Sequence, residues 1–282
     1  MNAKAIFRSL RSLRALVPTL LLSCLFALLL TAQQGFQSEA FQGEELERFL
    51  KEAKVTDIED VGKGVTLPMK ATLQLNGTTH QAVFKTIDVR KPMEKFADGT
   101  VEFDFQDTWK TEVAAYELDR LLGLGMIPVT IERVHEGRHG SLQFWMTVKM
   151  AEADRVKKKL NAPNTNRWNE QMHKMRVFDN LIYNTDRHLN NILITEDFQI
   201  RLIDHSRSFR VFDRLQTPKT LTRFSKMLLE KMEQLTEPQL QQRMGDYLSP
   251  GQIRALLKRR DLILTLSRDL VKQKGEAAVL YP

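Results

Sequence analysis

Two aspartates that flank a short pair of apolar segments constrain this chain more than any other feature. Ile192–Thr195 and Gln199–Ile203 are apolar and partly β-branched, and the acidic pair between them is typical of a turn. The pattern predicts a β-hairpin, which brings its two ends together. Asp186 precedes the first strand and Asp204 follows the second. We therefore expect both carboxylates at the same end of the hairpin.

Asn191 lies at the start of the first predicted strand, so the hairpin gathers Asp, Asn and Asp at one point. Oxygen ligands of this kind suit a hard divalent cation, and Mg²⁺ favours carboxylates together with phosphate oxygens. A further carboxylate beside such a metal can accept a proton from a hydroxyl. In kinases a catalytic-loop Asp orients the nucleophile, while an Asn and a later Asp hold metal.

The region before this hairpin is predicted to be rich in strands. Thr66–Leu75 and Thr79–Ile87 have strand composition, and Asn76-Gly77 between them is a strong two-residue hairpin signal. Lys85 lies on the return strand. A strand lysine is either exposed to solvent or, in the right setting, a phosphate ligand.

Gly62 and Gly64 precede these strands and predict a small turn. Glycines in such a turn can let the backbone approach phosphate groups. An ordinary turn explains them equally well, so they carry weight only beside other features.

Thr108–Leu122 is predicted to form a helix that Asp107 or Thr108 can cap and Gly123 can end. Glu112 lies in its first turn. It can simply complement the helix dipole, or it can pair with Lys85, as the strand lysine and helix glutamate of kinases do.

The segments around this helix complete the strand-rich region. Pro92–Asp107 is predicted to be a connecting loop or an excursion of the chain, with a turn at Asp98-Gly99. Ile127–Val134 and Leu142–Lys149 are predicted strands. Their join, His135–Gly140, matches the zinc-protease pattern HExxH, but that pattern requires a helix on which both histidines share a face. Glycines between β-branched strands predict a hairpin turn instead, so we reject the zinc site.

A change in composition divides the chain into lobes. The polar segment Lys157–Arg167 predicts a boundary between a strand-rich N-lobe at residues 55–153 and a helical C-lobe at residues 154–282. An N-terminal extension at residues 33–54 precedes both lobes and is predicted to contain a helix at Glu44–Lys54. A nucleotide could bind in the crevice between such lobes. The helices predicted for the C-lobe are Asn169–Tyr183, Lys219–Leu235 and Ile253–Lys272, with capping-box starts at Thr236 and Ser249.

The first 32 residues resemble a targeting segment. Four basic residues precede Ala15–Ala32, an apolar run that ends in small residues. This pattern predicts either a cleaved signal peptide or a membrane anchor, so the folded part is expected to be secreted, periplasmic or lumenal, with membrane association through residues 15–32 in the second case. Cys24, the only cysteine, lies in this run, so the exported chain would have no disulfide framework.

The net charge does not indicate a nucleic-acid partner. Subtracting the four basic charges of the first 32 residues from the formal +7 leaves +3. Nucleic-acid binding would require a clustered basic face, which the sequence does not show.

The candidate residues follow the order that a kinase uses: glycine turn, strand lysine, helix glutamate, linker, catalytic Asp, Asn and metal-binding Asp. We therefore predict an α+β, two-lobed protein-kinase-like fold. Four segments resemble the secretory-pathway kinases of the Golgi casein kinase group: Ala82–Lys85, Thr111–Leu122, Phe178–His188 and Ile203–Phe209. Asp186-Arg187-His188, together with Asn191, is also similar to the catalytic loop of phosphoinositide kinases.

The resemblance implies a role for each matched residue. Lys85 would contact ATP phosphates, and Glu112 would hold Lys85 or the metal. Asp186 would be the catalytic base, Asp204 a ligand of Mg²⁺ or Mn²⁺, and Asn191 a second metal ligand. His188 would lie near the transferred phosphoryl group or be a hydrogen-bonded loop histidine. The sequence departs from the Golgi group in lacking disulfides, in its sparse glycine turn and in His205-Ser206 where that group has Asn-Gly.

The function expected from the sequence is an exported, ATP-dependent kinase that acts on a hydroxyl of a protein or a glycan. One alternative is a pseudokinase that keeps the fold and serves as a scaffold. The other is a lipid kinase of the phosphoinositide type, which Asn191 and a membrane anchor would favour.

Overall fold

The computed structural model describes residues 43–61 and 68–282. The chain divides into residues 1–49 and 50–282, and the fold below belongs to the second unit, apart from helix α2 (Glu44–Glu52), which begins in the first. The predicted targeting segment, Gly62 and Gly64 lie outside the described residues. Within the described ranges, no helix is long and apolar enough to cross a membrane.

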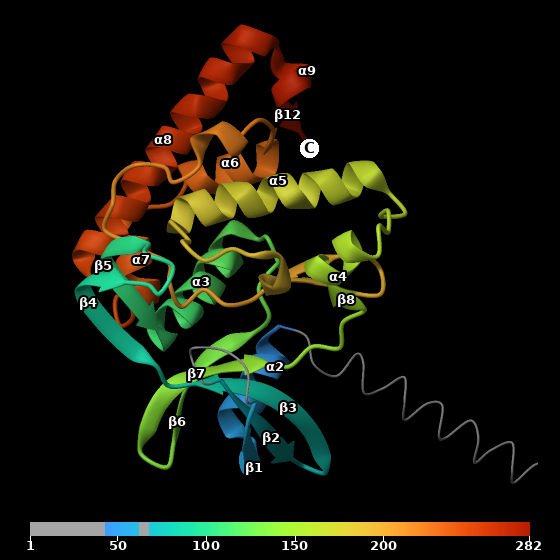
Figure 1. Cartoon of the computed structure of the whole chain (residues 1–282), viewed down its shortest axis with the longest axis vertical. Coiled ribbons are helices and arrows are strands. Elements are labelled where there is room, and N and C mark those ends of the chain that lie inside the picture. Colours follow the sequence, from blue (N-terminus) through green and yellow to red (C-terminus); the bar gives the residue numbers. More distant parts are fainter. Residues whose placement is uncertain (1–42, 62–67) are drawn as a thin grey trace, which may run out of the picture. The chain divides into compact units, whose positions relative to one another are not determined.

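The N-lobe is built on a five-stranded sheet with the order β1-β2-β3-β7-β6 (Figure 1). Its strands are β1 (Lys54–Asp60), β2 (Met69–Leu75), β3 (Thr78–Lys85), β6 (Thr130–His135) and β7 (Arg138–Phe144), and every neighbouring pair is antiparallel.

Two tight turns in this sheet confirm the predicted hairpins. Asn76 and Gly77 both have positive φ, at 50° and 79°, and so do Glu136 and Gly137, at 50° and 75°. Two consecutive residues with positive φ are characteristic of the type I′ turn, whose twist matches that of the strands it joins. The segment matching HExxH is therefore a β-turn, as predicted, and its histidines do not share a helix face.

Of the two predictions for residues 92–107, a connecting loop or an excursion, the loop was wrong. This segment belongs to a second hairpin, β4 (Asp88–Lys95) and β5 (Val101–Thr108), inserted between β3 and the next helix. The predicted turn at Asp98-Gly99 connects the two strands, and Gly99 has a φ of 87°. Pro92 fits in β4 because a two-stranded ribbon consists of edge strands, which tolerate proline.

Helix α3 (Trp109–Leu122) forms as predicted, with both expected caps. The Thr108 side chain accepts a hydrogen bond from the Lys110 backbone N–H, and Gly123 ends the helix with a φ of 64°. The helix packs on β6 and β7 and also contacts the C-terminal helices. It therefore joins the sheet to the helical part of the fold.

A glycine that the sequence did not single out sets the position of β3. A Cβ atom at Gly140 would lie 2.4 Å from the Lys85 carbonyl oxygen and 2.7 Å from the Phe84 ring. Only a residue without a side chain fits there, because the Lys85 contact is with backbone. The close approach fixes the end of β3 from which the Lys85 side chain extends.

Gly140→Ala is expected to destabilise the protein by about 1–3 kcal/mol, the usual cost of overpacking, and to weaken any ligand contact made by Lys85. Urea denaturation would measure the first effect. Gly251→Ala is the matched control, because its Cβ would meet only the Ser249 hydroxyl, at 3.8 Å. Equal stability of the two variants would contradict this account of β3.

The C-lobe is mainly helical. Its helices are α4 (Glu152–Lys157), α5 (Thr165–Ile182), α6 (Lys226–Glu233), α7 (Glu237–Met244), α8 (Pro250–Lys274) and α9 (Glu276–Val279). Short strands accompany them: β8 (Met150–Ala151), β9 (Ile192–Ile194) and β10 (Ile200–Leu202) in one sheet, and β11 (Phe224–Ser225) with β12 (Leu280–Tyr281) in another.

Some helix boundaries in this lobe were predicted correctly, and others were not. The predicted caps are confirmed, since Thr236 caps α7 and Ser249 forms a full capping box on α8. Helix α5 begins at Thr165, earlier than predicted, because Asn164 caps it. The single helix predicted at Lys219–Leu235 was wrong: Ser225 in β11 caps the shorter α6.

Candidate active site

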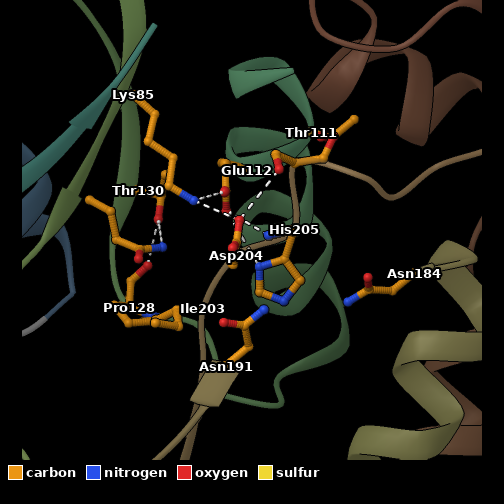
Figure 2. Close-up of polar contacts among 12 residues, drawn as sticks. Lys85, Thr111, Glu112, Pro128, Thr130, Asn184, Asn191, Ile203, Asp204 and His205 are labelled. Carbon is orange, nitrogen blue, oxygen red and sulfur yellow. Dashed lines mark hydrogen bonds and ion pairs between the residues drawn. The ribbon is translucent and has the colours of Figure 1, made fainter. Parts of the chain in front are cut away.

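Three charged side chains from three parts of the chain meet at the end of β3, the central strand of the five-stranded sheet. The Lys85 Nζ lies 2.6 Å from the Glu112 Oε1 on α3 and 2.8 Å from the Asp204 Oδ1, just after β10 (Figure 2). Lys85 and Glu112 are 27 residues apart in sequence, and Lys85 and Asp204 are 119 apart. The pairing of Lys85 with Glu112 is therefore present in the folded chain.

The environment keeps both members of this pair charged. Burial alone would lower the pKa of Lys85, but the attraction of Glu112 and Asp204 outweighs it and raises that pKa. Burial alone would raise the pKa of Glu112, but the charge on Lys85 and a hydrogen bond from His205 hold it well below its ordinary value. A fixed ammonium group thus faces the site across the whole neutral pH range.

The predicted β9–β10 hairpin is present and brings its two ends together. β9 pairs antiparallel with β10, and the Ile203 backbone N–H donates to the Asn191 carbonyl oxygen at 3.1 Å. Asn191 lies in a short 3₁₀ turn, η1 (Leu189–Asn191), immediately before β9. Its side-chain amide donates to the Asp186 carbonyl oxygen at 3.2 Å, so Asn191 holds the loop that contains Asp186.

Arg187, which the sequence did not single out, braces this loop from behind. Its guanidinium pairs with Asp179 of α5 at 3.0 Å and donates to the carbonyl oxygens of Asn191 and Ile203 at 2.9 and 2.8 Å. It also lies 2.9 Å from the Nε2 of the buried His205. Arg187 therefore connects the Asp186 loop, the two ends of the β9–β10 hairpin and α5.

The residues after Asp204 adopt an unusual backbone path. Asp204 has a φ of 62°, in the left-handed region that Asp and Asn tolerate better than most residues. The following His205 backbone N–H donates to Glu112 at 3.0 Å, and the Ser206 hydroxyl donates to Asp204 at 3.3 Å. Burial lowers the pKa of His205 and so favours the neutral form of its ring. His205 and Ser206, which stand where the Golgi casein kinase group has Asn-Gly, thus anchor the segment that follows Asp204.

A second network, also missed from the sequence, holds the Asp186 side chain. The Arg207 guanidinium lies 3.5 Å from the Asp186 carboxylate and also pairs with Glu102 of β5. The rings of Phe96 and Phe105 flank the same guanidinium, with centroids 4.9 and 5.5 Å away. Since Glu102 lies on the unpredicted β4–β5 hairpin, no short sequence motif could have indicated it.

The candidate residues line one cavity of about 790 Å³, larger than hollows of 340 and 270 Å³ elsewhere. Lys85, Asp186, His188, Asn191 and Asp204 all border it, as does Asp107. Asp107 is buried and its Oδ1 has no partner among the described residues. Burial raises the pKa of Asp107, and the nearby charge on Asp204 adds to this effect.

The oxygen atoms in this cavity fit a hard cation. Asp204 and Asn191 offer carboxylate and amide oxygens, the donors that Mg²⁺ and Mn²⁺ accept. In the part of the chain that the structure describes, no three His, Cys, Asp or Glu side chains cluster closely enough to hold a metal. Phosphate oxygens of a ligand would therefore have to complete the coordination sphere.

Two solved kinase structures share the fold of this chain. The crystal structure of the Golgi casein kinase superposes with a TM-score of 0.59 over 83% of this chain and 77% of its own, at 15% identity. The Helicobacter pylori proinflammatory kinase CtkA superposes with a TM-score of 0.52 over 81% of this chain and 98% of its own, at 12% identity. The predicted two-lobed, protein-kinase-like α+β fold is confirmed.

Comparison with models of sequence families identifies the family to which the chain belongs. The model of the phosphatidylinositol 3- and 4-kinase family matches residues 93–265, and the chain belongs to that family. The Golgi casein kinase C-terminal (Fam20) model matches residues 25–139. Both resemblances inferred from the sequence are thereby confirmed, and the protein is a kinase by family. No curated protein sequence gives a significant match.

Proposed function

We propose that this protein is an exported kinase that uses ATP with Mg²⁺ or Mn²⁺ and transfers the γ-phosphate to a hydroxyl of a protein or a glycan. One observation supports this more than any other. A single cavity contains a fixed cation, Lys85, and two carboxylates, Asp204 and Asp186. Phosphoryl transfer needs these three functions beside each other.

Each residue would act mainly by position and charge. Lys85, held by Glu112, would contact the phosphates, and Asp204 with Asn191 would hold the metal. The metal would neutralise charge that develops on the phosphate oxygens. Asp186 would accept a hydrogen bond from the acceptor hydroxyl and align its oxygen with the γ-phosphorus. His188 borders the same cavity and would lie near the transferred group.

Export is supported by two sequence features. The basic and apolar pattern of residues 1–32 is that of a signal peptide or anchor. The Golgi casein kinase group, whose family model matches residues 25–139, works in the secretory pathway. A secreted or lumenal location would be tested by expressing the full chain with a C-terminal tag and asking whether the tag reaches the medium or lumen.

A lipid acceptor is the second candidate, because the matched family is named for phosphatidylinositol kinases. The two candidates differ in where labelled phosphate arrives. After incubation with radiolabelled ATP, an acidic protein substrate and phosphatidylinositol vesicles, label in the organic phase would favour the lipid. Label in the protein precipitate would favour the protein acceptor.

Metal-dependent binding of ATP is the first test of this function. At an ATP concentration of one hundred times the dissociation constant, the folded state is expected to gain about 2.7 kcal/mol, seen as a rise in Tm that requires Mg²⁺ or Mn²⁺. Asp204→Asn should abolish the metal-dependent part, because it removes a charged ligand while keeping a residue that tolerates positive φ.

Asp197→Asn is the control, because this exposed aspartate lies in the turn at the other end of the same hairpin. It should bind ATP as the unmodified protein does. If the folded protein shows no response to any nucleotide with either metal, the kinase proposal fails and a pseudokinase scaffold becomes the better explanation.

A further inference from the structure

A chain of two hydrogen bonds ends at Gln143, which lines the cavity and lies on the sheet that also carries Lys85. The Thr130 hydroxyl donates to the Pro128 carbonyl oxygen at 2.8 Å. The Gln143 side-chain nitrogen donates to the Thr130 hydroxyl oxygen, also at 2.8 Å. Thr130 and Pro128 are labelled in Figure 2, which draws these contacts as dashed lines.

This chain fixes which way the Gln143 amide faces. A carbonyl oxygen can only accept, and a hydroxyl has a single hydrogen to donate. Because Pro128 takes that hydrogen, the Thr130 oxygen must receive its other bond from a donor. The Gln143 NH₂ group therefore faces Thr130, and its Oε1 faces the opposite way. Orientation of an amide is normally inferred from such a network, and the amide orientation in the structure agrees with this one.

Gln143 lies where a nucleotide base would sit. It pairs with Val83 of β3 across the sheet, and Val83 is two residues, or roughly 6.6 Å, along the strand from Lys85. Val83, Gln143, Trp145 and Ile203 border the cavity together with Lys85. If Lys85 meets phosphates, the apolar surface beside Gln143 is the wall available to a flat aromatic base.

The Gln143 Oε1 is an acceptor in need of a donor. Among the described residues, no group donates a hydrogen bond to it, and Gln143 as a whole is 9% exposed. A ligand that covers this oxygen in the cavity without donating to it leaves the acceptor buried and unpaired, which lowers the affinity of that ligand. The amide thus favours a ligand that presents an N–H group at this point.

We propose that Gln143, oriented by Thr130, selects purines with a 6-amino group over purines with a 6-oxo group. The inference rests on the proposed nucleotide binding and adds base specificity to it. Adenine can donate its amino hydrogen to the Gln143 Oε1. Guanine and hypoxanthine would place their 6-oxo oxygen next to the Gln143 Oε1, so that two acceptors would face each other without a hydrogen between them. Gln143 is a specificity residue in this proposal, and Thr130 is a positioning residue.

The test removes the hydrogen bond between the base and Gln143 first by changing the nucleotide and then by changing the protein. The dissociation constants of ATP, inosine triphosphate and purine riboside triphosphate, which lacks the 6-substituent, would be measured by calorimetry with Mg²⁺. The unmodified protein should bind ATP about three- to tenfold more tightly than purine riboside triphosphate, the range expected for one net hydrogen bond. Inosine triphosphate should bind more weakly still.

Three variants separate this role from a purely structural one. Gln143→Met keeps the size but has no strong acceptor, so it should bind ATP and purine riboside triphosphate alike. Thr130→Val removes the hydroxyl that fixes the amide and should reduce the preference for ATP over inosine triphosphate. Thr130→Ser restores the hydroxyl and should restore the preference. A general loss of folding would weaken all nucleotides equally and leave their ratios unchanged.

Two results would overturn the inference. Equal binding of ATP and inosine triphosphate by the unmodified protein would remove it while leaving the kinase proposal intact. Unchanged preference in Gln143→Met would do the same. Failure of the folded protein to bind any of the three nucleotides would refute the proposed function itself, and the base selection with it.

Discussion

Asp186→Asn is expected to slow phosphoryl transfer by about 10²–10⁴-fold, the usual effect of a positioned general base, while ATP binding stays roughly unchanged. The Asp186 carboxylate lies at the cavity wall and is 37% exposed, so an acceptor can reach it. Asparagine keeps the shape of the side chain but cannot take a proton. The loop should persist, because Asn191 and Arg187 hold it through backbone groups.

The rate of ATP hydrolysis, in which water replaces the acceptor, measures this effect before the acceptor is known. Calorimetry with ATP and Mg²⁺ supplies the binding comparison. Asp197→Asn, the same change in an exposed turn, should leave both quantities unaltered. A variant at Asp186 that hydrolyses ATP at the original rate would show that this carboxylate does not orient the nucleophile.

Glu112→Gln is expected to cost about 3–5 kcal/mol of stability, the range observed when one member of a buried ion pair is removed. Glu112 is 2% exposed and Lys85 12% exposed, with 2.6 Å between their charged atoms. Glutamine can still accept the bond from the His205 backbone, but its NH₂ group would then face the Lys85 ammonium. Affinity for ATP should fall as well, since Lys85 loses its fixed position.

The difference in stability between the unmodified protein and Glu112→Gln depends on pH, as the pKa shifts of Glu112 and Lys85 indicate. Because the pKa of Glu112 is depressed in the fold, its stabilisation is complete above the unfolded value of about 4.3 and disappears as the pH falls through the lower folded value. The pKa of Lys85 is raised, so its contribution holds below about 10.4 and is lost at higher pH. The stability difference should therefore be flat between about pH 5 and 10 and shrink in acid.

Urea denaturation at pH 7 and pH 3 would test both the size and the pH dependence. The matched control is Glu233→Gln, in a pair with Arg268 whose side chains are both more than half exposed. Such surface pairs contribute about 0–1 kcal/mol. A Glu112→Gln variant as stable as this control would mean that the buried pair does not hold α3 against the sheet.

Local chemistry explains why much of the fold could be predicted. Neighbouring residues set the hairpin at Asn76-Gly77, the caps Thr108 and Ser249, and the two strands that lie between Asp186 and Asp204. Turn and cap preferences act over two to four positions, so a sequence pattern reveals them directly. The order of the charged residues along these elements then pointed to a kinase.

What could not be predicted depends on contacts between distant segments. Gly140 resembles any other strand glycine until β3 is placed against it. Arg187 could have been read as an exposed loop residue, and Glu102 fell in a segment expected to be irregular. Asp107 was considered only as a helix cap, because its burial beside Lys85 depends on tertiary packing that no local pattern encodes.

The β4–β5 hairpin has a consequence for how this protein can be divided. Its Glu102 bonds Thr185, Arg207 and Arg210, which lie 83 to 108 residues further along the chain. Arg210 is completely buried. A C-terminal fragment that began after the five-stranded sheet would have to bury the Arg210 guanidinium without Glu102, its carboxylate partner. Such a fragment would neither fold by itself nor arrange the Asp186 loop. The helical half is therefore not an exchangeable module, and fragment complementation or domain swapping can succeed only if residues 88–108 travel with it.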